Sequence, residues 1–190
     1  MIREIENVFV DLPGYQCFGC DPMNDCGLKI KIFANDETGE VFTRIKTDDH
    51  FSGFPGILHG GIQCTLIDEI AFWVMFDRVK KIGVTANIQI DFFKTINSSL
   101  LLEVRGIVDN IRENTGLVDV NISNENNEVY TRAKIIYYIA DNEKMLKILG
   151  KERIPAKLLR YLDDKQVIRL YDHTVSGNCY KTTPLEIRKS

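Results

Sequence analysis

The chain has 190 residues, of which 44% are hydrophobic and 27% are charged, and its formal net charge is −3. This composition is typical of a folded globular protein and excludes extensive disorder, which requires low hydrophobicity and high net charge. The small negative charge gives no basis for binding nucleic acid or an anionic membrane surface, so we expect neither as a partner.

The absence of a recognisable targeting signal and the pattern of cysteines favour a cytoplasmic protein. No apolar run approaches the roughly 20 residues that span a bilayer, and the first residues carry charges where a secretory signal needs an apolar segment. The five cysteines are an odd number, and three of them fall within residues 17–26. This is not the pattern of a secreted disulfide framework, so we expect reduced thiols.

The N-terminal part of the chain contains weak patterns that predict short secondary-structure elements. Residues 1–15 alternate weakly between apolar and polar, which predicts a short strand or helix lying over the core. A turn-rich loop at residues 16–27 then leads into a predicted strand at residues 28–32, where apolar residues alternate with lysines. A second strand is predicted at residues 40–46.

The stretch at residues 53–76 organises the rest of the chain. It is a glycine-rich turn followed by a long apolar helix that begins with the His-Gly-Gly sequence at residues 59–61. Unpaired backbone N–H groups and the positive end of the helix dipole make such a start a natural site for developing negative charge. The helix carries only two charges, Asp68 and Glu69, and a carboxylate is costly to bury without a partner or a function.

A series of strands follows this helix. Residues 83–93 give the clearest alternation in the sequence, which predicts a half-buried antiparallel strand. Three more strands are predicted at residues 99–108, 115–123 and 128–140, separated by short polar turns. We expect Trp73, Phe92 and Phe93 to lie in the core.

The order of these elements predicts an α+β fold. One helix among about six antiparallel strands can bury its apolar surface on all sides only if the sheet curls around it. We assign residues 1–141 to this domain, with its core at about 15–141. Residues 142–190 are predicted to form a C-terminal extension, helical at 145–149 and 155–162 and then irregular.

The two adjacent carboxylates cannot do the same job. At about 100° per residue, Asp68 shares a helix face with Gly61 and Thr65, whereas Glu69 lies on the stripe of Leu66. Asp68 lies about two turns after Gly61, or roughly 10 Å along the axis.

Four segments resemble a known family. The sequences GFPGILHGG (53–61), TLIDE (65–69) and VTANIQIDFFKTI (84–96) resemble hotdog-fold acyl-CoA thioesterases, and among them the PaaI-like and THEM-type members of the 4-hydroxybenzoyl-CoA thioesterase superfamily. The sequence CFGCDPMNDCGLKI (17–30) is similar to the N-terminal segment of many of these proteins. The resemblance implies an antiparallel sheet wrapped around one central helix, and hydrolysis of acyl-CoA thioesters to a free acid and coenzyme A.

The resemblance also implies a catalytic apparatus shared between two subunits. In the family, two domains join their sheets side by side as a homodimer, or as a dimer of dimers, and each active site draws on both subunits. Carried over by motif, the backbone N–H of Gly60 or its neighbour Gly61 would polarise the thioester carbonyl, Asp68 would act as nucleophile or general base, and Thr85 would assist the attacking water. Coenzyme A enters as part of the substrate, and no separate cofactor is expected.

Four further residues are candidates for substrate binding. Gly53 occupies the position at which some relatives carry an asparagine that helps to place substrate or water, and Phe54 beside it is expected to form a pocket wall. His59 is either a structural hydrogen-bond anchor or a base. Glu69 is either a rival to Asp68 as the base or a carboxylate paired with Lys, Arg or a backbone group at the dimer seam.

Two questions are left open by the sequence. Cys17, Cys20 and Cys26 lie close together, but no fourth ligand at zinc-finger spacing accompanies them, so we expect no metal.

Two other functions also fit the fold that the resemblance implies. One is a non-hydrolytic acyl-CoA binding protein whose C-terminal extension plugs or gates the site. The other is a hotdog hydratase or dehydratase, which would need a His and acid pair such as His59 with Asp68.

Overall fold

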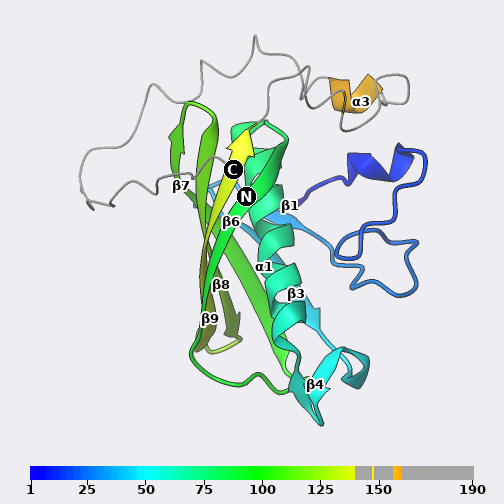
Figure 1. Ribbon diagram of the computed structural model, residues 1–190, viewed down its shortest axis with the longest axis vertical. Helices are drawn as coiled ribbons and strands as arrows, with labels where there is room; N and C mark the ends of the chain where they lie inside the picture. The colour runs from blue at the N-terminus through cyan, green and yellow to red at the C-terminus, as the bar shows by residue number, and fades with distance from the viewer. Residues whose placement is uncertain (140–146, 148–155, 160–190) are drawn as a thin grey trace, which may run out of the picture.

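One long helix packed against a curled antiparallel sheet dominates the computed structural model, which describes residues 1–139, 147 and 156–159 (Figure 1). The helix, α1, spans Gly60–Val74 and is continued by a π-helical turn at Met75–Val79. The seven-stranded sheet has the order β1-β2-β3-β7-β8-β9-β6. Its strands are β1 Ile2–Glu4, β2 Phe33–Asn35, β3 Val41–Lys46, β6 Gly83–Phe92, β7 Leu101–Arg112, β8 Thr115–Asn124 and β9 Val129–Ile139. The short strands β4 Ser52–Phe54 and β5 Ile57–Leu58 form a separate pair.

The side chains of α1 explain why the sheet wraps around it. Its buried residues recur at spacings of mostly three to four and include Leu66, Ile67, Ile70, Trp73 and Val74. On β7, Gly106 lets the helix approach closely, because a Cβ at this position would lie 2.9 Å from Ile70 Cγ2 and 3.0 Å from Val74 Cγ2. Glycine is therefore required where the helix crosses the sheet.

The N-terminal segment covers the side of α1 that faces away from β7–β9 (Figure 1). It contains both a strand, β1, and a short 3-10 helix, η1, at Val8–Asp11. The Phe9 ring packs on three rings of α1 and its π-helical turn, with centroid distances of 5.5 Å to Phe72, 5.8 Å to Trp73 and 5.2 Å to Phe76. The predicted short element lying over the core is confirmed.

The strand predicted at residues 28–32 is wrong in position, because the sheet pairing starts only at β2. The alternating apolar residues of this segment are buried as expected. Its backbone, however, bonds to the preceding loop: the N–H of Leu28 donates to the carbonyl of Phe18 (2.7 Å), and that of Ile30 donates to the carbonyl of Gly19 (3.0 Å). The alternation of apolar residues and lysines at 28–32 therefore reflects which side chains are buried, and it does not indicate pairing with a neighbouring strand.

The strand predicted at residues 83–93 is confirmed as β6, but the burial expected for it is not. Phe92 and Phe93 are 51% and 55% exposed, so their assignment to the core is wrong, whereas Trp73 is fully buried as predicted. β6 is an edge strand that pairs only with β9, and its register shifts between Thr85 and Asn87. A strand with one neighbour and a bulge leaves apolar side chains exposed in a single subunit.

The other predicted strands are confirmed as β3, β7, β8 and β9, and β1 brings the sheet to seven strands instead of about six. In the predicted C-terminal extension, α3 (Ala156–Leu159) lies within the expected helix at 155–162, and its Leu158 is buried in the core. The helix expected at 145–149 falls outside the described residues except for residue 147. No helix in the described ranges combines the length and the apolar character needed to cross a membrane.

Candidate active site

Two separate cavities lie along α1. The first, which we call the glycine cavity, has a volume of about 470 Å³ and is lined by residues that include Gly53, Phe54, His59, Gly60 and Phe92. The second, which we call the acid cavity, has a volume of about 380 Å³, and its lining includes Phe9, Cys17, Asp68, Glu69, Thr85 and Tyr137. The two cavities share no lining residue.

The glycine cavity contains the first turn of α1, where His59 is the N-cap residue. Its Nδ1 atom accepts a hydrogen bond from the backbone N–H of Gly61 at 2.8 Å. Because a backbone N–H can only donate, Nδ1 carries no proton, and the proton of the neutral ring lies on Nε2. The amide of Gly61 is therefore engaged. Among the described hydrogen bonds the N–H of Gly60 has no acceptor, so Gly60 provides the donor that a ligand can use.

Gly53 and Phe54 form part of the wall of this cavity. A Cβ at Gly53 would lie 2.9 Å from Cδ2 of His59, so the glycine makes room for the imidazole ring. The Phe54 side chain is 77% exposed at the rim. Gly53 thus contributes space to this wall of the cavity.

In the acid cavity, Asp68 is held by two hydroxyl groups from the sheet. Its Oδ1 atom accepts a hydrogen bond from Thr85 Oγ1 at 2.7 Å, and the hydroxyl oxygen of Tyr137 lies 3.2 Å from the same atom. The Tyr137 hydroxyl also lies 2.9 Å from the main-chain oxygen of Asp68. The other carboxylate oxygen, Oδ2, has no hydrogen-bond partner among the described residues. One oxygen of Asp68 is therefore fixed, and the other is available to a water molecule or substrate.

Tyr137 is a site residue that the sequence did not reveal. It lies directly opposite Thr85 in the pairing of β6 with β9, and it is almost fully buried. Burial raises its pKa, and the charge of Asp68 raises it further, so the hydroxyl stays protonated and can donate. The buried face of β9 is mostly apolar, with Ala133, Ile135 and Ile139, and its other hydroxyl, that of Thr131, donates to Gln63 Oε1. A buried hydroxyl on such a face indicates a polar partner, but only the strand register identifies the partner of Tyr137 as Asp68.

Glu69 points to a different set of groups from Asp68, as the helix geometry predicted. Its Oε1 atom accepts a hydrogen bond from the Cys17 thiol at 2.8 Å, a partner that the sequence did not suggest. Burial, aided by the bond with Cys17, raises the pKa of Glu69 to about 8. Hydrogen bonding between the two free thiols lowers the pKa of Cys17 and, with burial, raises that of Cys20. The third cysteine of the predicted group, Cys26, is exposed and lies outside this cluster.

The chain matches the family model described as thioesterase superfamily over residues 55–131. This segment contains the first turn of α1, Asp68 and Thr85, whereas Tyr137 and the Cys17 loop lie outside it. A relative in Rattus norvegicus, acyl-coenzyme A thioesterase THEM4, is 27% identical over 121 residues, which cover 63% of this chain. The chain spans about half the length of that relative, 52% of it.

Solved structures give the same fold. A hypothetical thioesterase protein from Streptococcus pneumoniae, whose structure contains coenzyme A, is 24% identical with a TM-score of 0.51, covering 54% of this chain and 82% of that one. A thioesterase from Haemophilus influenzae is 20% identical with a TM-score of 0.55, covering 60% of this chain and 79% of that one. At these identities the likeness shows the architecture, which is the α+β hotdog fold expected from the sequence. The chain therefore has the hotdog fold, and its residues 55–131 match the thioesterase superfamily model.

Proposed function

We propose that this protein hydrolyses acyl-CoA thioesters to a free acid and coenzyme A. The observation that carries the proposal is the Asp68 carboxylate, which Thr85 and Tyr137 hold at the wall of the acid cavity. The aromatic and aliphatic side chains of Phe9, Leu12 and Phe72 line the same cavity and suit an acyl group. The family match and the coenzyme A in the pneumococcal relative support the substrate class.

The proposed chemistry follows from the free atoms at each end of the site. Oδ2 of Asp68 takes a proton from a water molecule as it attacks the thioester carbon, or Asp68 attacks that carbon directly as the nucleophile. Thr85 fixes the carboxylate and offers its hydroxyl oxygen to the attacking water. The backbone N–H of Gly60 donates to the carbonyl oxygen as it gains negative charge, an interaction worth about 3 kcal/mol in the transition state. In the first route the C–S bond then breaks, and the coenzyme A thiolate receives the proton that Asp68 took from water. In the second route breakage of the C–S bond leaves an anhydride between Asp68 and the acyl group, and a water molecule cleaves it to the free acid and Asp68, with the released proton going to the thiolate.

This assignment requires a dimer, because the donor and the acid line different cavities of one subunit. The outer edge of β6 has no partner among the described strands, and Val84, Phe92 and Phe93 are exposed along it. Phe92 marks the glycine end of this strand, since its ring lies 3.8 Å from where a Cβ of Gly60 would be. Thr85, bonded to Asp68, marks the other end.

Antiparallel pairing of β6 with its symmetry-related copy would therefore bring the two ends together. In a two-fold arrangement, the Phe92 end of one strand lies beside the Thr85 end of the other. Gly60 of one subunit then approaches Asp68 of its partner, and two equivalent sites form. We propose this homodimer, alone or as half of a tetramer, as the active unit.

The first test is hydrolysis by the unaltered protein. We expect the full chain to release coenzyme A from an acyl-CoA panel, measured by trapping the free thiol and subtracting a substrate-free blank for the five cysteines of the chain. Tight acyl-CoA binding without thiol release across the panel would contradict the proposal and favour the non-hydrolytic binding protein. Addition of water to an enoyl-CoA would favour the hydratase. No observation favours that alternative now, because the Nδ1 atom of His59 is engaged by Gly61.

A further inference from the structure

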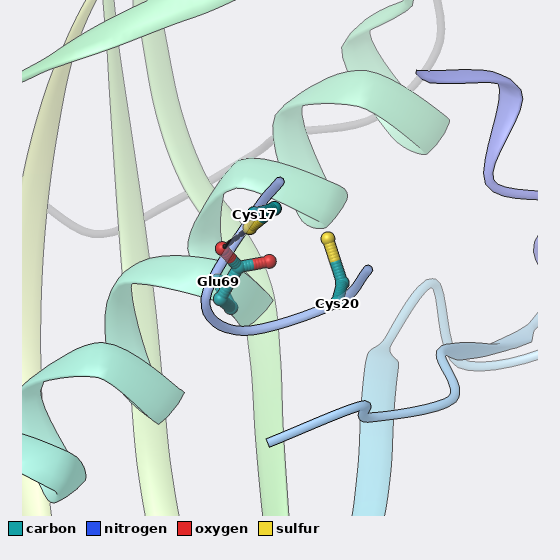
Figure 2. Close-up of side chains that lie close together, drawn as sticks. All are labelled: Cys17, Cys20 and Glu69. Atoms are coloured by element: carbon teal, nitrogen blue, oxygen red, sulfur yellow. Dashed lines mark hydrogen bonds between the residues drawn. The ribbon is translucent and has the colours of Figure 1, made fainter. Parts of the chain in front are cut away.

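Three potential metal ligands converge at the edge of the acid cavity (Figure 2). The Sγ atoms of Cys17 and Cys20 and a carboxylate oxygen of Glu69 all lie within 4.8 Å of one another. Cys17 and Cys20 come from the N-terminal loop, and Glu69 comes from the middle of α1. Figure 2 shows the Cys17 thiol against one oxygen of the Glu69 carboxylate, with the Cys20 sulfur to the side of the other oxygen.

The loop is shaped to hold these groups. At Gly19, between the two cysteines, a Cβ would lie 2.2 Å from Cγ and 2.4 Å from Cδ of Glu69, so only glycine lets the loop lie against the carboxylate. The loop is fixed on both sides: Asn7 Nδ2 donates to the carbonyl of Cys20 (3.1 Å), and the N–H of Ile30 donates to the carbonyl of Gly19 (3.0 Å). The three ligand atoms are therefore preorganised by the fold.

The carboxylate of Glu69 is also incompletely satisfied. Its Oε2 atom is buried and has no hydrogen-bond partner among the described residues. Within the described part of the chain, no Lys, Arg or His forms an ion pair with Glu69. A largely buried carboxyl group beside two sulfur atoms, with no cation paired to it, offers three ligand atoms that a metal ion can bind as it displaces their protons.

We propose that Cys17, Cys20 and Glu69 bind one zinc ion, with water from the acid cavity in the fourth position. Thiolate ligands select zinc over the hard cations magnesium and calcium, and zinc accepts carboxylate oxygen in the same tetrahedral sphere. The Tyr15 hydroxyl lies 3.0 Å from the Cys20 Sγ atom and supplies an outer-shell hydrogen bond. From the sequence we expected no metal, because no fourth ligand at zinc-finger spacing accompanies the three cysteines. Glu69 lies 49 residues beyond Cys20, and only the fold brings it to the pair. This proposal does not depend on the proposed hydrolysis.

The test measures metal binding directly. The reduced full chain, stripped of metal by a chelator, is titrated with Zn²⁺ in competition with a chromophoric chelator, and bound zinc is counted by mass spectrometry. We expect about one equivalent per chain. C17S, C20S and E69Q should each weaken binding by about 100-fold or more, since the loss of an outer-shell partner alone costs 10- to 100-fold. C26S is the matched control, because Cys26 is exposed in the same loop, and it should bind like the unaltered protein.

Further measurements distinguish a zinc site from a redox-active pair of thiols. Co²⁺ added to the unaltered protein should give the charge-transfer absorption of thiolate ligands, and its absence would overturn the proposal whether or not the variants fold. Unchanged zinc affinity in folded E69Q, or equal losses in C26S and C17S, would also overturn it. Failure of the reduced protein to take up zinc, together with formation of a Cys17–Cys20 disulfide in air, would assign the pair to redox chemistry instead.

Discussion

Replacing Asp68 by Asn is expected to lower kcat for acyl-CoA hydrolysis by about 100- to 10,000-fold, the range that general acid-base catalysis contributes. The amide has the shape of the carboxylate, and its oxygen can still accept the Thr85 hydrogen bond, so the cavity should keep its form. The amide cannot take a proton from water or attack the thioester carbon. The loss should therefore appear in kcat and not only in KM.

A matched control separates this effect from a general loss of charge. Asp109 is exposed on β7 and lines neither cavity, so Asp109→Asn should leave kcat unchanged. Steady-state kinetics on one acyl-CoA substrate, with circular dichroism to verify folding, compares the two variants. Full activity in a folded Asp68→Asn protein would remove Asp68 from the mechanism.

Replacing Gly60 by Pro is expected to lower kcat by about 100- to 1,000-fold, the loss typical of removing one oxyanion donor. Proline deletes the backbone N–H, which is the free donor of the glycine cavity. The fold should tolerate the change, because Gly60 is the first residue of α1, a position that proline favours. His59 before it has φ −61° and ψ 137°, an extended conformation that suits a residue preceding proline.

Gly60→Ala is the matched control for this substitution. Alanine keeps the N–H, and its Cβ would meet only the Phe92 ring at 3.8 Å, an ordinary van der Waals contact. We expect Gly60→Ala to retain most of the activity that Gly60→Pro loses, measured under the same assay conditions. Equal losses of activity in the two variants would mean that Gly60 is needed because it lacks a side chain, and not because its N–H donates a hydrogen bond.

The sequence predicted those features of the fold that depend on local patterns. The His-Gly-Gly start and the apolar periodicity of α1 defined its beginning, and the helix geometry separated Asp68 from Glu69, as the structure shows. The strands from β6 to β9 followed from alternation and polar turns. The same reasoning failed at residues 28–32, where alternating burial arises without a neighbouring strand.

The contacts that complete each site could not be predicted, because they join distant parts of the chain. Tyr137 meets Asp68 across 69 residues, and Cys17 meets Glu69 across 52. Both contacts depend on the strand register and on how the N-terminal loop crosses α1, which no local pattern encodes. Phe92 and Phe93 are exposed at the edge of β6, although their apolar character predicted burial. This is the edge at which we propose that a second subunit pairs.

Mixed dimers reveal whether Asp68 of one subunit works with Gly60 of the other. Asp68→Asn and Gly60→Pro subunits, carrying different affinity tags, are co-expressed, and dimers that contain one of each are isolated through both tags. If the site is shared, one of the two sites in each mixed dimer combines an intact Asp68 with an intact Gly60. The mixed dimer should then recover about half of the unaltered activity, although each parent is nearly inactive. A mixed dimer as inactive as its parents would show that the acid and the donor act within one subunit and that no site is shared.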